Sequence, residues 1–239
     1  MAFQRIDRRS VPDEVVDQLV GDVVTGELAA GESLPAERRL AEVLGVSRPA
    51  VREALQRMAH AGLLEVRQGG ATTVRDFRRY AGLDLLPRLL FAGGELDTGV
   101  VRSILEARVA MGREVAGLAA QRGGAPLGRV LHEAVAALGA VADDPVAQQL
   151  RALEFWDLVV DGADSIVYRL MFNGLRVAYE PALEALSSVM AAEVSRVEAY
   201  SRLADAVAAS DVDGARVVAA DLLGSATAEL LAVLRRLEE

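Results

Sequence analysis

A chain of 239 residues with 52% hydrophobic and only 4% aromatic residues can form one large or two modest domains, with a helix-favouring core of Ala, Val and Leu. It has no Cys, which excludes disulfides and Cys-based zinc sites. It also has neither a bilayer-length apolar run nor a signal-peptide stretch, so we expect a cytoplasmic protein without a membrane partner. The net charge of −9 argues against a uniformly basic DNA-binding protein, but residues 1–80 carry 12 Arg and 12 acidic residues, so all the excess acid lies beyond residue 80.

The first third of the chain predicts three helices and a hairpin. Apolar residues recur at helical spacing in three segments, separated by Gly, Pro and Ser residues that stop or cap helices. Two β-prone runs then flank a glycine pair. The expected elements are helices Val11–Gly26, Ala36–Leu44 and Arg48–Ala61 and strands Leu63–Arg67 and Ala71–Arg75. This order is typical of a winged helix-turn-helix, which we assign to residues 1–76.

The rest of the chain predicts helices and no strand. We expect a linker at residues 77–84 and a helical domain at residues 85–239. Short Gly- or Asp-containing breaks between the segments indicate an antiparallel bundle of six to seven helices. The expected helices are Leu83–Phe91, Asp97–Arg122, Pro126–Val141, Pro145–Val160, Ile166–Leu186, Ala191–Ser210 and Asp213–Leu237. The fold class is therefore mostly α, with a small β-hairpin in the N-terminal domain.

The segment from Leu34 to Leu55 carries the most specific motif. It reads LPAERRLAE and then GVSRPAVREAL, and the segment from Gly62 to Ala71 continues with GLLEVRQGGA. This pattern resembles the GntR family of bacterial regulators, in particular its FadR subfamily. The resemblance implies a DNA-binding repressor, although Pro49 and Ala50 stand where the family often has hydroxyl residues.

The residues of this motif have the chemistry of base and phosphate recognition. A recognition helix enters the major groove with its N-terminal residues leading, and guanidinium groups can bind guanine O6 and N7. A simpler interpretation is that the arginines only solvate exposed helix faces. By resemblance to the family, the DNA-contacting positions are Arg38, Ser47, Arg48, Arg52, Gln68 and Gly69.

The second domain resembles the FCD effector domain of the same subfamily. The resemblance rests on the stretch SILEAR from Ser103, on GLAAQR from Gly117, and on the aromatic residues between Phe155 and Tyr179. Many FCD domains hold a divalent metal with three His and one carboxylate. In this sequence those positions fall on Trp156, Tyr200, Leu222 and Ala152, none of which is a good metal ligand. We therefore expect no metal and no other cofactor.

The sequence lacks the metal-binding residues of the family, and in this respect it resembles those members that bind long-chain fatty acyl-CoA. An apolar tail suits a bundle interior of Leu, Val and Ala, with a few polar groups to orient the head of the ligand. The predicted effector-binding residues are Arg108, Trp156, Tyr168, Asn173, Tyr179, Tyr200 and Ser225. Each could instead be an ordinary core or surface residue.

These features predict a homodimeric transcription regulator that binds a palindromic operator and responds to a small-molecule effector. The alternatives are a regulator that responds to a small organic acid, and a helical-domain enzyme fused to a DNA-binding domain. The absence of Lys and Cys argues against an enzyme that uses a Schiff base or a thiol nucleophile.

Overall fold

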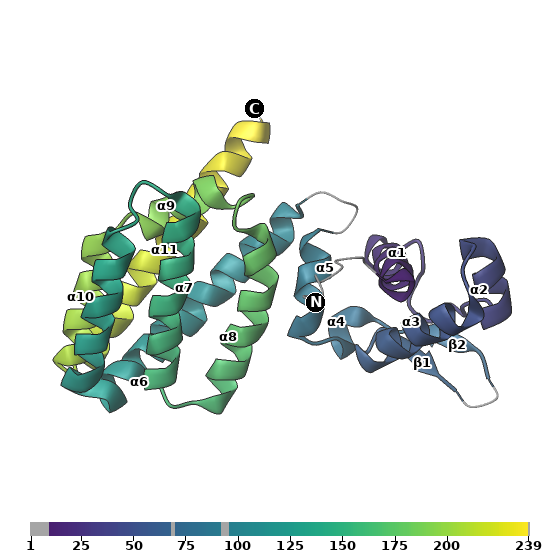
Figure 1. The fold of residues 1–239 in the computed structure, drawn as a ribbon, viewed down its shortest axis with the longest axis horizontal. Coiled ribbons are helices and arrows are strands. Elements are labelled where there is room, and N and C mark those ends of the chain that lie inside the picture. Colours follow the sequence, from purple (N-terminus) through teal and green to yellow (C-terminus); the bar gives the residue numbers. More distant parts are fainter. Residues whose placement is uncertain (1–9, 68–69, 92–95, 239) are drawn as a thin grey trace, which may run out of the picture. The chain divides into compact units, whose positions relative to one another are not determined.

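The computed structural model describes residues 10–67, 70–91 and 96–238, which form helices and one small antiparallel sheet (Figure 1). The chain divides into two compact units, Met1–Glu95 and Leu96–Glu239. The predicted fold class is confirmed, because a helix-turn-helix with a hairpin is followed by a helical domain. No helix in the described ranges is long and apolar enough to cross a membrane.

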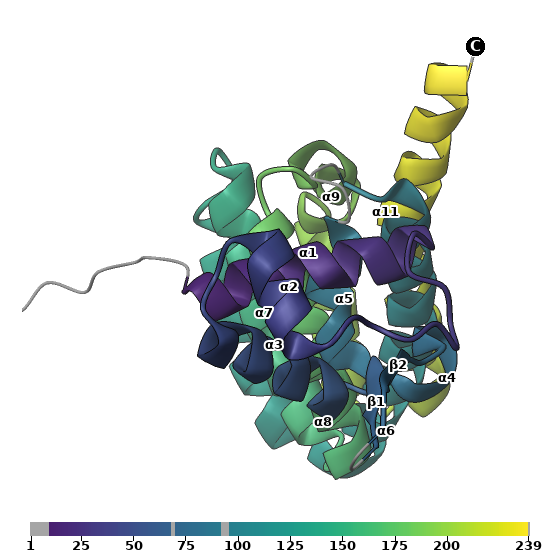
Figure 2. The same cartoon turned by 90° about the vertical axis from the view of Figure 1, so that its right-hand side faces the viewer.

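Three helices form the centre of the first unit: α1 (Val11–Thr25), α2 (Glu37–Leu44) and α3 (Arg48–His60). Ser10 caps α1 in a capping box, and Gly26 ends it in the left-handed conformation. The apolar faces of α1 and α3 pack together, and Figure 2 shows α1 running across the view above α3. The core is Val, Leu and Ala, as the composition predicts.

The hairpin pairs β1 (Leu64–Val66) with β2 (Thr72–Val74), Leu64 opposite Val74. Gly62 allows the sharp turn from α3 into β1, because its φ is +77° and a Cβ there would lie 2.3 Å from the carbonyl oxygen of Tyr80. The hairpin therefore starts at a fixed position relative to α3.

The segment after the hairpin belongs to the first unit. It forms α4 (Phe77–Tyr80), a 3-10 turn η1 (Leu83–Leu85) and α5 (Leu86–Leu90). Leu85 is buried in the core of this unit, and Arg88 of α5 forms an ion pair with Asp17 of α1 at 3.1 Å. The division therefore falls after Glu95, whereas the sequence pattern placed the linker at residues 77–84. Helical periodicity in the sequence shows that a segment has an apolar face, but it does not show which of the two domain cores that face packs against.

The second unit is a helical bundle around one long helix. Its elements are α6 (Thr98–Gly139), α7 (Pro145–Gly162), α8 (Ile166–Tyr179), a 3-10 turn η3 (Glu180–Ala182), α9 (Ser187–Val194), α10 (Val197–Ala208) and α11 (Val212–Glu238). Helices α7, α10 and α11 pack against α6 (Figure 1). A kink at Gly124, with φ of +52°, divides α6 into the two helices predicted there.

Two predicted helices were wrong in extent. The helix predicted at Ile166–Leu186 ends at Tyr179, because Pro181 has no N–H to continue the hydrogen-bond pattern. The helix predicted at Ala191–Ser210 is interrupted at Arg196, whose ψ of 56° is not helical. The Arg196 guanidinium forms an ion pair with Asp221 of α11 at 2.5 Å.

Candidate functional site

The N-terminus of α3 has the features of a recognition helix. Ser47 caps it, because its hydroxyl oxygen accepts a hydrogen bond from the backbone N–H of Ala50 at 3.4 Å. Arg48 and Arg52 follow on the exposed side, while Val51 and Ala54 are buried against the core. The helix thus presents guanidinium groups outward from its leading end.

Arg52 is held by an acidic side chain of α2. Its Nε donates to Glu37 Oε1 at 3.2 Å, and its Nη2 donates to Glu37 Oε2 at 2.9 Å. The hydrogen bond from Arg52 lowers the pKa of Glu37, so this carboxylate is ionised at neutral pH. A DNA phosphate or guanine that binds Arg52 must therefore compete with Glu37.

The start of α2 adds further arginines to this surface. Arg38 and Arg39 are exposed, and both contact Glu42, at 3.3 and 3.5 Å. The Arg52–Glu37 ion pair brings the start of α2 close to the exposed side of α3. Gln68 and Gly69 lie outside the described residues, so their predicted part in the wing stays a prediction.

The second unit contains a small cavity lined by residues of α6, α7, α8 and α11. Its volume is about 40 Å³, room for about one water molecule. Most of its walls are apolar, and two arginines reach it. The lining residues are Arg108, Met111, Gly112, Val115, Leu153, Trp156, Val160, Phe172, Leu175, Arg176, Tyr179 and Leu223.

Arg108 forms a buried ion pair with Glu193 of α9. Arg108 Nη2 lies 2.9 Å from Glu193 Oε1, and Nη1 lies 3.3 Å from Oε2. Glu193 is fully buried, and the Tyr200 hydroxyl donates to its Oε1 at 3.3 Å. The two charges therefore neutralise each other inside the bundle.

Two tyrosines beside this pair remain neutral. Burial raises the pKa of both Tyr179 and Tyr200 well above the ordinary range. The Tyr179 hydroxyl donates to the side-chain oxygen of Gln149. The Gln149 amide in turn donates to the carbonyl oxygens of Pro145 and Leu183, each at 3.1 Å.

Trp156 lies in the same region and its side chain is buried. Its Nε1 makes no hydrogen bond of normal geometry among the described residues, and the nearby acceptor is the hydroxyl of Tyr200, whose pKa it lowers. The indole N–H therefore belongs to the same buried polar cluster as Tyr200 and Glu193.

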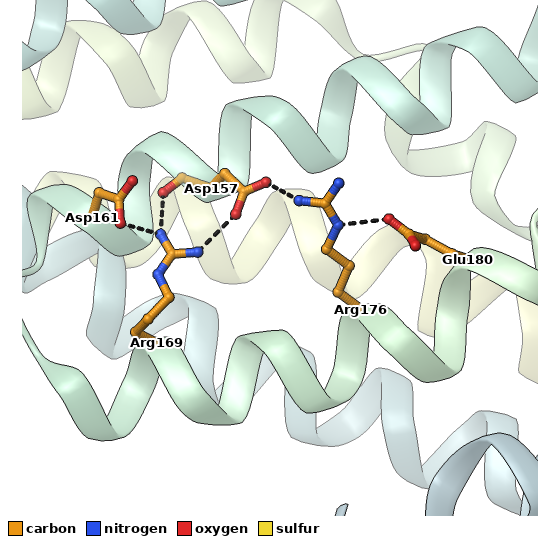
Figure 3. Close-up of polar contacts among 5 residues, drawn as sticks. All are labelled: Asp157, Asp161, Arg169, Arg176 and Glu180. Atoms are coloured by element: carbon orange, nitrogen blue, oxygen red, sulfur yellow. Dashed lines mark hydrogen bonds and ion pairs between the residues drawn. The ribbon is translucent and has the colours of Figure 1, made fainter. Parts of the chain in front are cut away.

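An ion-pair network joins α7 to α8 beside the cavity (Figure 3). Asp157 of α7 accepts from both Arg169 and Arg176 of α8. Arg169 also contacts Asp161, and Arg176 Nε donates to Glu180 at 2.7 Å. Both arginines of α8 thus have acidic partners.

The structure brings some of the predicted effector residues together. Arg108, Trp156 and Tyr179 line the cavity, and Tyr200 reaches Arg108 through Glu193. Four predicted residues do not line it: Tyr168, Asn173, Tyr200 and Ser225.

Asn173 is exposed, because it lies on the outer side of α8 with Leu170 and Val177. Tyr168 is half-buried on the same helix. The Ser225 hydroxyl donates to the Leu222 carbonyl oxygen at 2.6 Å.

Three polar residues were missed from the sequence. Glu193 completes the pair with Arg108, Gln149 holds Tyr179, and Arg176 reaches the cavity. Glu193 had a visible signal, since it is the single charged residue of the apolar helix α9. Nothing in the local pattern distinguishes Gln149 or Arg176 from surface residues.

The residues at the family's metal positions do not fit a metal ion. Trp156, Tyr200, Leu222 and Ala152 are buried, and none offers an imidazole or a carboxylate. Among the described residues there is no group of three His, Cys, Asp or Glu placed to hold a metal.

Two family models match the chain. Residues 12–74 match "Bacterial regulatory proteins, gntR family", and residues 103–225 match the FCD domain. The first match covers the three helices and the hairpin, and the second covers the bundle with its cavity.

Curated proteins and solved structures give the same relationship. The HTH-type transcriptional regulator Mce2R of Mycobacterium tuberculosis is 58% identical over 98% of this chain and 97% of its own. The fatty acid metabolism regulator protein of Vibrio cholerae is 38% identical over 38% of this chain and 32% of its own. The fold is similar to Lar, which controls the expression of the Listeria monocytogenes agr system (TM-score 0.61, 16% identity, 95% of this chain and 99% of that one). It is also similar to E. coli McbR/YncC (TM-score 0.51, 23% identity, 95% and 100%).

Proposed function

The chain belongs to the GntR family of bacterial regulatory proteins and carries an FCD domain, and from this premise we propose how its two units regulate transcription. It is a DNA-binding transcriptional regulator. A role on chromosomal DNA supports the expected location in the cytoplasm.

The exposed side of α3 reads the operator. Arg48 and Arg52 stand at its leading end, where side chains reach base edges in the major groove. Arg38 and the capped N-terminus of α3 bind phosphates, because a helix N-terminus and a guanidinium both attract anions. The observation that carries this proposal is the outward array of Arg38, Arg48 and Arg52 on two adjacent helices.

A gel shift of Arg52→Ala tests this assignment. The operator is first selected from random duplexes by the full chain. We expect Arg52→Ala to lower affinity for this operator by about 1–3 kcal/mol, with relaxed specificity at one base pair of each half-site. Arg113→Ala, an exposed arginine of α6, is the control. Unchanged affinity and specificity in Arg52→Ala would show that its guanidinium only solvates the helix.

The effector binds at the cavity of the second unit. Its apolar walls, two arginines and a tyrosine match the usual composition of a small-molecule site. Ligand sites usually have about 300–1,000 Å³, so the effector must enlarge the cavity as it binds. We favour a fatty acyl compound such as long-chain acyl-CoA. The fatty acid metabolism regulators are similar to this chain over 90 residues, which adds modest support.

A small organic acid is the second candidate effector. The observation in its favour is that Arg108 and Arg176 both reach the cavity. Thermal shift with oleoyl-CoA, with short dicarboxylates and with Zn²⁺ separates the candidates. Stabilisation by Zn²⁺ alone would contradict both.

The outer face of α8 supports a homodimer. Ile166, Val167, Leu170 and Val177 are exposed there at helical spacing, and Arg169 and Arg176 of this helix are paired with acidic side chains of α7 and η3. An uncharged face suits self-association of an acidic protein, because like charges would not meet across a two-fold axis. Two copies would then read a palindromic operator.

The same helix offers a route from effector to operator. Phe172, Leu175 and Tyr179 of α8 line the cavity, while Leu170 and Val177 lie on its outer face. An effector that enlarges the cavity displaces α8 and with it the dimer face. A change in affinity for DNA follows if the effector binds one arrangement better than the other. We expect the effector to release a repressor from its operator.

A further inference from the structure

We propose that the cavity binds a neutral carbonyl group on an apolar chain, such as an ester, thioester or amide, and rejects the corresponding free carboxylate, because Glu193 already occupies Arg108. This inference rests on the effector site proposed above. It concerns which of the two candidate effector classes that site accepts.

The first argument is the charge balance around the cavity. Arg108 is paired with Glu193, and Arg176 is paired with both Asp157 and Glu180. The adjoining Arg169 is paired with Asp157 and Asp161 (Figure 3). These three guanidinium groups thus face four carboxylates. Among the described residues around the cavity, each of these guanidinium groups is already paired, and none is left unpaired for the carboxylate of a ligand.

The second argument is that a ligand can displace Glu193 from Arg108 only at a large cost in free energy. Its side chain is fully buried on α9, and it accepts hydrogen bonds from Arg108 and Tyr200. A ligand carboxylate beside Arg108 would place two anions on one guanidinium in a water-poor interior, where like charges repel strongly. Displacing Glu193 would in turn leave a buried carboxylate unpaired.

The third argument is that hydrogen-bond donors remain available. A guanidinium has five N–H donors, and the contacts of Arg108 with Glu193 and with the sulfur of Met190 use fewer than that. The Nε1 of Trp156 makes no hydrogen bond of normal geometry among the described residues, although the Tyr200 hydroxyl lies near it. A neutral carbonyl oxygen has two lone pairs and accepts such bonds without adding charge.

Decanoate and decanamide form a matched pair of probes, since they share chain length and differ in the charge of the head group. Isothermal titration of the full chain at pH 7.5 should give at least about tenfold tighter binding of decanamide. In Glu193→Gln, Arg108 loses its counter-ion, so decanoate should bind at least about tenfold more tightly than it binds the wild type, with decanamide little changed. Glu154→Gln, an exposed residue of α7, is the matched control and should behave as the wild type.

A variant without either charge covers the case in which Glu193→Gln does not fold. Arg108→Gln with Glu193→Gln leaves no unpaired buried charge, and it should bind both probes with similar affinity. Continued rejection of decanoate by this double variant would show that Glu193 is not the cause and would overturn the inference. Preference of the wild type for decanoate would also overturn it, while leaving the effector site intact. Binding of neither probe by the wild type would overturn the effector site itself.

Discussion

Each unit of the protein contains an ion pair in which an arginine contacts both carboxylate oxygens of a glutamate, but the surroundings of the two pairs differ. Arg52–Glu37 in the first unit is largely exposed, with 58% and 32% of the two side chains accessible. Arg108–Glu193 in the second unit is buried, with 17% and 0% accessible. The surface pair is separated at small cost, which suits the DNA contact that we propose for Arg52. The buried pair is held, which suits a site whose charge must not change.

The largest expected effect tests this difference through stability. Glu193→Ala leaves Arg108 charged and unpaired in the bundle, so we expect the free energy of unfolding of the second unit to fall by about 3–5 kcal/mol. Glu37→Ala should cost no more than about 1 kcal/mol in the first unit. Trp156 is the single tryptophan of the chain and lies in the second unit, so its fluorescence during urea unfolding follows that unit.

Glu37→Ala serves as the control in this experiment, because it should leave the fluorescence transition unchanged. A fluorescence transition that Glu193→Ala leaves as unchanged as Glu37→Ala does would contradict the contrast between the buried and the exposed pair.

A smaller effect is expected from a charge on the outer face of α8. Leu170 is 61% exposed, and Leu170→Glu would bury a carboxylate in the proposed dimer. We expect dimer dissociation to become at least about 100-fold more favourable, since an unpaired buried charge costs several kcal/mol. Sedimentation equilibrium of the full chain measures this.

Val217→Glu is the matched control for Leu170→Glu, because Val217 is 68% exposed on a different helix, α11. If both variants remain dimeric, the α8 face is not the interface. A monomeric wild type at micromolar concentration would equally exclude it.

The smallest expected effect concerns the surface pair and DNA. Glu37→Gln removes a negative charge close to Arg52, so we expect operator affinity to rise roughly fivefold, about 1 kcal/mol for two unit charges about 4 Å apart in water. The gain should shrink as salt is raised. Gel shifts at two salt concentrations measure it, and an unchanged or lower affinity would indicate that Glu37 positions Arg52 for binding.

Much of the first unit followed from local sequence. Ser47 caps α3, Gly26 ends α1, and the Gly-rich segment after β1 separates two paired strands, because caps and turns depend on residues within a few positions of one another. The arginines of α3 were predicted on its exposed side, because helical period alone places them opposite Val51.

In the second unit, local pattern determined the existence of most helices and not their partners. The interruption at Arg196 and the partner of Glu193 depend on contacts with helices distant in the sequence. The sequence thus determined the fold class, the recognition helix and the missing metal ligands. The tertiary structure alone decided that Arg108 meets Glu193, that Asn173 lies outside the cavity, and that α5 joins the first unit. Packing between elements decides which ion-pair partner a side chain meets and which domain core a helix joins. Periodicity within one element encodes neither.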